Sequence, residues 1–159
     1  MLTALQAAFV AALAAQLAAL PPQAGELVPL TVGPYGGELL GEASVIEIVP
    51  ALWVDIEQAT LEADDESGLS LDGTPRVELI MATRNDASAA AGYSDGHALA
   101  DWTLRALTAS LEAGVVVAQT GSSQRARLEG RIQYRRIARG SRLWVGAFTV
   151  PVRLFYDPS

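Results

Sequence analysis

Residues 143–156 have the sequence LWVGAFTVPVRLFY, a long strand-like stretch that closes the chain. Apolar residues occupy one parity, which is the period of a strand with one face in a core. That face consists of Trp144, Phe148, Val150, Val152 and Leu154. Pro151 cannot donate a hydrogen bond to a neighbouring strand. We therefore expect a long strand that lies at an edge of its sheet or bulges at the proline.

The first twenty residues have the spacing of an amphipathic helix. The larger apolar side chains recur every three or four positions, at Leu2, Leu5, Phe9, Leu13, Leu17 and Leu20. The run has no charged residue, but it lacks the basic segment of a signal peptide and is interrupted by Gln6 and Gln16. We expect a helix that packs on the domain and ends at Pro21 and Pro22, rather than a membrane span.

A second helix is expected from about His97 to Ala113, with Gly114 as its stop. Ser94 or Asp95 is a suitable cap at its start. Its apolar sector consists of Leu99, Trp102, Ala106 and Leu107, with Leu111 at the margin. This sector is broad enough to cover a sheet.

Alternating apolar residues predict further strands at 51–57, 76–83 and 127–137, with a short lead-in at 45–48. In the first of these, Leu52, Val54 and Ile56 alternate with Trp53, Asp55 and Glu57, as in a half-buried strand. In the second, Val77, Leu79 and Met81 share one face.

Two intervening stretches are expected to be loops. Residues 32–39 are rich in glycine and proline and suit a surface loop. Residues 62–75 are acidic but lack the ligand register of a calcium loop, so a solvated hairpin loop is favoured. The chain is thus predicted to be a single domain over residues 1–159. Its class is α+β, with a mainly antiparallel sheet of about four to five strands packed against two helices.

Charge is divided along the chain. Residues 1–104 carry fifteen acids and only Arg76 and Arg84, a net of −13, whereas residues 105–159 carry nine arginines and three acids, a net of +6. All eleven basic residues are arginine, whose planar guanidinium binds carboxylates through two hydrogen bonds. The two parts could neutralise each other inside one fold, or the chain could meet copies of itself or another acidic partner. The sequence leaves both interpretations open.

Four arginines form a row in and just before the predicted strand 127–137. Arg125, Arg127, Arg131 and Arg135 share one parity, and Tyr134 has the other. A nucleic-acid groove would need aromatic side chains among the arginines for stacking, and Tyr134 points away from them. The row is therefore a solvated strand face or a partner-docking surface. We take these four arginines as the candidate docking residues.

No catalytic, cofactor or metal site is expected. The one histidine, His97, lies at a predicted helix start, where Ser94 and Asp95 are better explained as caps than as triad members. Cysteine and lysine are absent, which excludes thiolate metal sites and a phosphate-binding loop with its lysine. Paired carboxylates stay open, because spatial pairing among eighteen acids is invisible in the sequence. A small hydrolase is the remote alternative to a protein without enzymatic activity.

Several short motifs resemble the small tail protein family of Mu-like bacteriophages. They are TVGPYGGEL at 31–39, VPALWV at 49–54, ATRN at 82–85, and the closing strand from Trp144 to Tyr156. That family is similar in role to the tail terminators of long-tailed phages, such as the lambda tail protein U. The resemblance spans nearly the whole chain in the order of its elements, although the alanine-rich first helix departs from it.

The resemblance implies a subunit that forms a hexameric ring on the head-proximal end of the tail tube, stops tube polymerisation and offers a surface for joining the head. Its partners would be copies of itself, the tail tube protein and a head-completion or neck protein. DNA would only pass through the ring lumen, and no membrane would be involved. The protein would assemble in the bacterial host cytoplasm and end in the virion. A head-completion or neck connector protein of the same phage is the alternative.

Overall fold

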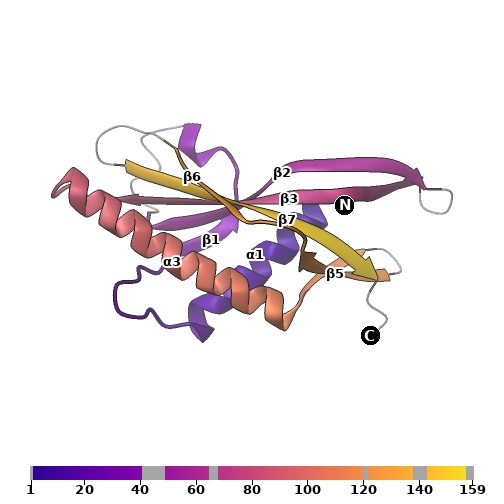
Figure 1. Cartoon of the computed structure of the whole chain (residues 1–159), viewed down its shortest axis with the longest axis horizontal. Helices are drawn as coiled ribbons and strands as arrows, with labels where there is room; N and C mark the ends of the chain where they lie inside the picture. The colour runs from indigo at the N-terminus through magenta and orange to yellow at the C-terminus, as the bar shows by residue number, and fades with distance from the viewer. Residues whose placement is uncertain (1, 41–48, 65–67, 120–121, 138–142, 157–159) are drawn as a thin grey trace.

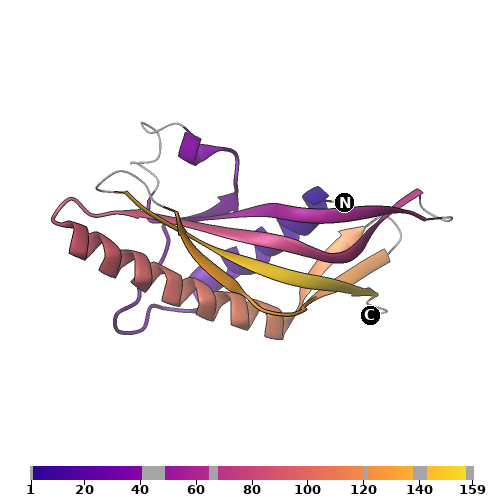
Figure 2. The same cartoon turned by 45° about the horizontal axis from the view of Figure 1, so that its top comes forward.

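The computed structural model describes residues 2–40, 49–64, 68–119, 122–137 and 143–156. In chain order the elements are α1 (Leu2–Ala19), β1 (Thr31–Pro34), the 3-10 helix η1 (Glu38–Leu40), β2 (Ala51–Asp64), β3 (Gly68–Arg84), α3 (Ala89–Ala113), β4 (Val115–Gln119), β5 (Ser122–Leu128), β6 (Gln133–Ile137) and β7 (Leu143–Tyr156). Helices α1 and α3 both lie on one side of a curled sheet, as Figures 1 and 2 show from two directions.

The sheet has seven strands in the order β1-β2-β3-β7-β5-β4, and β6 also pairs with β7. Only β1 and β2 run parallel; the other pairs are antiparallel. The expected α+β class, with a mostly antiparallel sheet against two α-helices, is confirmed for the described residues. The sheet has more strands than the four or five expected, because β1 and β4 were not predicted and the strand expected at 127–137 is divided into β5 and β6.

Strand β7 has the predicted bounds but lies inside the sheet. It pairs with β3 along one edge, and with β6 and then β5 along the other. Between these two partners, residues 129–132 stand opposite residues 150–151 as a bulge, in which Glu129 N–H donates to the Pro151 carbonyl at 2.9 Å. Neither expected alternative is right: β7 is not at an edge, and its own register with β3 runs unbroken from Leu143 to Pro151. Since Pro151 has no N–H to offer a neighbour, the irregularity falls on the strand that faces it.

The main core lies between the sheet and the two helices. The sheet contributes Trp144, Phe148, Val150 and Val152 from β7, Val77, Leu79 and Met81 from β3, and Leu52 and Val54 from β2. The helices contribute Leu99, Trp102, Ala106 and Leu107 from α3, and Leu5, Phe9 and Leu13 from α1. The apolar faces predicted for these elements are thus confirmed, except that Leu2, expected in the stripe of the first helix, is exposed. Burying one such side chain stabilises the fold by roughly 1.5–3 kcal/mol, so the helix–sheet interface dominates the stability.

By length and composition, α1 could cross a membrane. In this structure its Leu5, Phe9 and Leu13 stripe is fully buried against the sheet. The Gln6 side chain donates to the Val54 carbonyl at 2.8 Å, and Trp102 Nε1 donates to the Leu20 carbonyl at 3.0 Å. These bonds tie both ends of α1 to the domain.

A smaller cluster covers part of the opposite face of the sheet, on the side where Figure 1 places η1. There Trp53 packs with Leu39, Ile80, Ala82 and Val145. The start of β2 is therefore buried on both faces, which corrects the expectation of a half-buried strand. Residues 31–34, expected as part of a surface loop, are β1 and pair with residues 51–54.

Strands β2 and β3 continue well past the rest of the sheet. Residues 62–75 were expected to be a loop, yet pairing runs on from Thr60↔Asp72 to Asp64↔Gly68. β3 leaves β7 at Arg76, so this part has two strands only and projects beyond the other elements (Figure 1). The lead-in strand expected at 45–48 lies outside the described residues.

Helix α3 begins earlier than predicted. Its cap is Ser88, whose Oγ accepts a hydrogen bond from Ala91 N–H at 3.0 Å, rather than Ser94 or Asp95. The sequence does not predict this first part of the helix, because it contains Gly92 and Gly96 and glycine is a poor helix former. Gly96 has a packing role: a Cβ there would stand 2.2 Å from Trp144 Cδ2. The predicted stop at Gly114 is confirmed, with a φ of 98°.

We predict opposite effects for two glycine-to-alanine changes in α3. Gly96→Ala should lower the free energy of unfolding by about 1–3 kcal/mol, because Trp144 has to move. Gly92→Ala should raise it by up to about 1 kcal/mol, because a Cβ at Gly92 meets only Asn85 Cβ at 3.9 Å. Denaturant unfolding of both variants checks this. Equal effects at the two positions would show that Trp144 does not pack on Gly96.

Candidate interaction surface

The four candidate arginines lie in three structural settings. Arg125 and Arg127 belong to β5, Arg131 lies in the bulge, and Arg135 belongs to β6. The bulge offsets the pairing with β7 by two residues, so parity is kept on either side of it. The structure therefore breaks the expected row into separate positions, each with different neighbours.

Arg135 is held by the fold. It pairs with Glu78 of β3 across the intervening strand β7. The Glu78 side chain is only 8% exposed, while that of Arg135 is 58% exposed. A buried carboxylate needs its cation, so this arginine has a structural task besides any docking role.

Arg125 lies against the end of α3. The nearest atom that a Cβ at Gly114 would meet is Arg125 Cζ, at 3.1 Å. A guanidinium at this point is favourable because a helix C-terminus carries partial negative charge. Arg125 therefore also has a role within the fold.

Arg127 and Arg153 face each other directly in the pairing of β5 with β7. Both guanidinium groups lie over the ring of Phe155, with Cζ at 5.0 Å and 5.5 Å from its centroid. We call Arg127, Arg153 and Phe155 the arginine platform. Two like charges placed opposite each other on neighbouring strands are destabilising, by roughly 0.2–1 kcal/mol. Among the acids that the structure describes, the exposed Glu129 approaches Arg153, at 3.7 Å.

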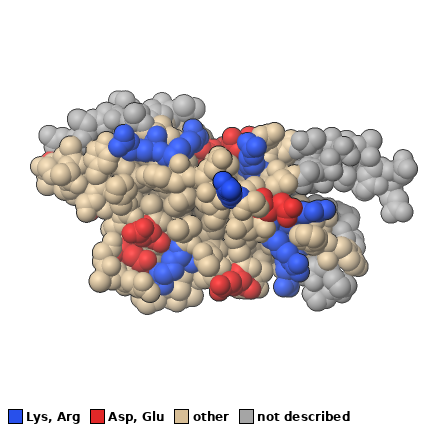
Figure 3. Space-filling model, in the orientation of Figure 1, with Lys and Arg blue, Asp and Glu red and all other residues tan. Residues whose placement is uncertain are grey.

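Sequence reasoning selected Arg127 but left Arg153 and Phe155 out of the candidate site. The sequence does place both residues on a surface-facing side, because they have the parity opposite to the apolar face of β7. Since Val152 and Leu154 pack toward the helices, the platform lies on the other face of the sheet. Arg131 is exposed in the adjoining bulge. In Figure 3 most of the basic side chains on this view lie along the sheet, above the position of α3.

Two ion pairs join the acidic and the basic parts of the sequence, Arg105–Glu26 and Arg135–Glu78. Arg153 instead pairs within its own part, with Glu129. The interpretation that the two parts neutralise each other inside the fold is therefore met for Arg105 and Arg135. The interpretation that the chain meets copies of itself or an acidic partner stays a prediction.

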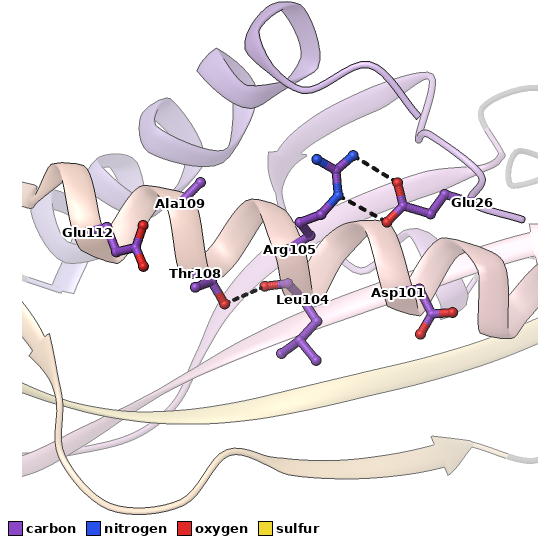
Figure 4. A pocket seen from close by; sticks show the side chains of 7 residues that line it. All are labelled: Glu26, Asp101, Leu104, Arg105, Thr108, Ala109 and Glu112. Atoms are coloured by element: carbon purple, nitrogen blue, oxygen red, sulfur yellow. Dashed lines mark hydrogen bonds and ion pairs between the residues drawn. The ribbon is translucent and has the colours of Figure 1, made fainter. Parts of the chain in front are cut away.

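An open hollow of about 400 Å³ lies along the outer side of α3. It is lined by Glu26, Asp101, Leu104, Arg105, Thr108, Ala109 and Glu112 (Figure 4). Arg105 binds Glu26 through two hydrogen bonds, of 3.0 and 2.8 Å, and also donates to the Pro21 carbonyl at 2.8 Å. The hydrogen bond from Arg105 lowers the pKa of the Glu26 carboxyl. This contact fastens the segment after α1 to α3.

Asp101 and Glu112 have no basic partner in the described part of the chain. The only guanidinium in the hollow is already bound to Glu26, so two carboxylates remain uncompensated there. The hollow is thus acidic, with the partly exposed Leu104 between its two free acids.

His97 lies beside two aromatic rings. Its ring contacts Tyr93 and Trp144 edge-on, at centroid distances of 6.5 and 6.4 Å. Asp95 accepts a hydrogen bond from Asn85 at 2.8 Å. Nearby, Arg136 stacks on Tyr93 at 4.8 Å, and burial raises the pKa of Tyr134. Among the described residues, no group of three acids or histidines is placed to hold a metal ion.

Comparison of the chain with protein-family models and with curated proteins gave no match. The surfaces described above therefore carry the evidence on function.

We predict that Glu26→Gln destabilises the protein at pH 7 and that the effect fades in acid. The folded-state pKa of Glu26 is lowered, so the charged carboxylate stabilises the fold above the unfolded pKa of ~4.3. That contribution is lost as the pH falls through the folded-state pKa. Urea unfolding of both proteins from pH 7 down to about pH 3, below the unfolded pKa, measures the difference. A gap that widens toward acid would contradict the assignment.

We also predict different costs for two arginines of the row. Arg135→Ala should lower the free energy of unfolding by about 1–3 kcal/mol, because it leaves the buried Glu78 unpaired. Arg127→Ala should cost less than about 1 kcal/mol, since its charge is on the surface. Adding Glu78→Gln to Arg135→Ala should recover part of the loss. A double variant as unstable as the sum of its two single variants would rule out the coupling.

Proposed function

We propose that this protein is a ring-forming tail terminator. It caps the head-proximal end of a phage tail tube, stops tube polymerisation and offers the surface that joins the head. Its partners are copies of itself, the tail tube protein and a head-completion or neck protein. It acts in the virion, after assembly in the bacterial host cytoplasm, as a structural component rather than an enzyme.

The observation that carries the proposal is the arginine platform. It places two guanidinium groups and an aromatic ring on the sheet face opposite α1 and α3, where the exposed Glu129 makes a loose contact of 3.7 Å with Arg153. Arginine and aromatic residues are enriched at protein interfaces, where they supply much of the binding energy. An acidic partner would relieve the repulsion between Arg127 and Arg153.

Two further features support an assembly role. A head-to-tail ring joins two different patches of each subunit, and the acidic hollow along α3 and the arginine platform are two such patches of opposite charge. The projecting β2–β3 hairpin has strand pairing on its inner edges only, and a two-stranded hairpin is marginally stable alone. A neighbouring subunit or the tube would stabilise it. The resemblance of the short motifs at 31–39, 49–54, 82–85 and 144–156 to the Mu-like small tail proteins favours the terminator among assembly proteins.

Electron microscopy of phage lysates with and without this protein tests the proposal. Without it, we expect tails of irregular, extended length that do not carry heads, because nothing stops tube growth. Supplying the protein from a plasmid should restore uniform, joined tails. Uniform headless tails in its absence would instead favour the neck connector. Uniform tails that join heads would refute both roles.

A further inference from the structure

The outer side of α3 carries an exposed stripe. Its first two residues touch the sheet, Tyr93 beneath Arg136 of β6 and His97 beside Trp144 of β7, whereas no strand of the described chain covers it from Asp101 onward. Tyr93, His97, Asp101, Leu104, Thr108 and Glu112 follow one another at three- or four-residue spacing and are all exposed. Tyr93 is 42% and Leu104 39% exposed, which is high for large side chains on a helix that is otherwise well packed. We use the name α3 stripe for Asp101, Leu104, Thr108 and Glu112.

The α3 stripe presents two free carboxylates about 16 Å apart, on either side of an apolar residue. Arg105, the guanidinium nearest to them in the hollow, is already paired with Glu26 through Nε and Nη2, and Nη2 also donates to the Pro21 carbonyl. The stripe therefore has the features of an acidic docking face with an apolar centre.

The arginine platform has the complementary chemistry. Arg127 and Arg153 present guanidinium groups that bind carboxylates through paired hydrogen bonds, and Phe155 provides apolar area beside them. Phe155 remains 36% exposed. The weak contact of Arg153 with Glu129 at 3.7 Å leaves most of this capacity unused.

The two surfaces cannot meet within one chain. The α3 stripe points away from the sheet, since Leu99, Trp102 and Ala106 occupy the side of α3 that faces it. The platform lies on the far face of the sheet, where Arg153 alternates with the buried Val152. Figures 1 and 2 show α3 on one side of the sheet only.

We propose that the α3 stripe of one copy binds the arginine platform of the next copy. The contact is heterologous, because it joins two different surfaces, and repeating it closes a ring when the rotation fits. This inference rests on the proposed function, which calls for a ring, and assigns the residues that hold neighbouring copies together.

Charge reversal tests the contact on the full-length chain. One variant carries Asp101→Arg with Glu112→Arg, and a second carries Arg127→Glu with Arg153→Glu. Each alone brings like charges together at every contact, so self-association measured by sedimentation should weaken at least about tenfold. A matched control, Arg76→Glu with Arg84→Glu, makes the same charge change on β3 and should associate like the wild type. Circular dichroism and thermal unfolding confirm that each variant is folded.

Mixing the two variants gives the decisive result. The α3 stripe of the first variant, now basic, then meets the platform of the second, now acidic. The acidic α3 stripe of the second variant meets the arginine platform of the first, so the two variants should alternate in one assembly. Recovery of wild-type association in the mixture, together with recovery of tail length when both variants are supplied to lysates lacking the protein, supports the contact. Recovery in neither assay overturns it. A control that associates as poorly as the platform variant also overturns it, because the effect would then be one of net charge.

The outcomes separate the contact from the function. If the mixture fails to recover while the wild-type protein still sets tail length, the terminator role stands and the α3–platform contact is wrong. If the mixture recovers association while lysates lacking the protein make normal, joined tails, the contact stands and the terminator role is wrong.

Discussion

The central position of β7 is the constraint on which the rest of the structure depends. β3 pairs with one of its edges and β6 and β5 with the other, so β7 connects the two halves of the sheet. Its apolar face supplies Trp144, Phe148, Val150 and Val152 to the core beneath the helices. Gly96 lets α3 approach close enough to lie on the Trp144 ring. A strand this deeply paired leaves no freedom to slip, because a shift of one residue would turn its apolar face outward.

The same strand determines where the arginines lie. Pro151 offers no N–H, and the partner strand bulges opposite it, which separates Arg127 from Arg135. On one side of the bulge Arg135 reaches Glu78, and on the other Arg127 meets Arg153 over Phe155. Pro151 thus divides the arginine row: Arg135 neutralises the buried carboxylate of Glu78, and Arg127 stays on the surface.

Much of the fold could be predicted because its signals are local. The bounds of β7, the buried faces of α1, β3 and α3, and the stop of α3 at Gly114 follow from periodicity and from glycine chemistry. What failed depends on contacts distant in sequence. β1 is a strand because residues 31–34 pair with β2, although their glycine and proline favour a loop. The start of α3 was missed because Gly96 lies inside it. Glycine is a poor helix former, but at this position it lets the helix pack on Trp144. The docking residues were found only in part, since the pairing of Arg127 with Arg153 depends on a register that no single segment contains.

The central claim is that surface charge left over by this fold drives copies of the chain together. The mass of the purified wild-type protein, measured by sedimentation across a range of salt and protein concentrations, tests it most directly. The account predicts a closed oligomer at low salt that dissociates to folded subunits as salt screens the arginines and acids. A monomer at every salt and protein concentration, or an oligomer that salt leaves unchanged, would contradict it.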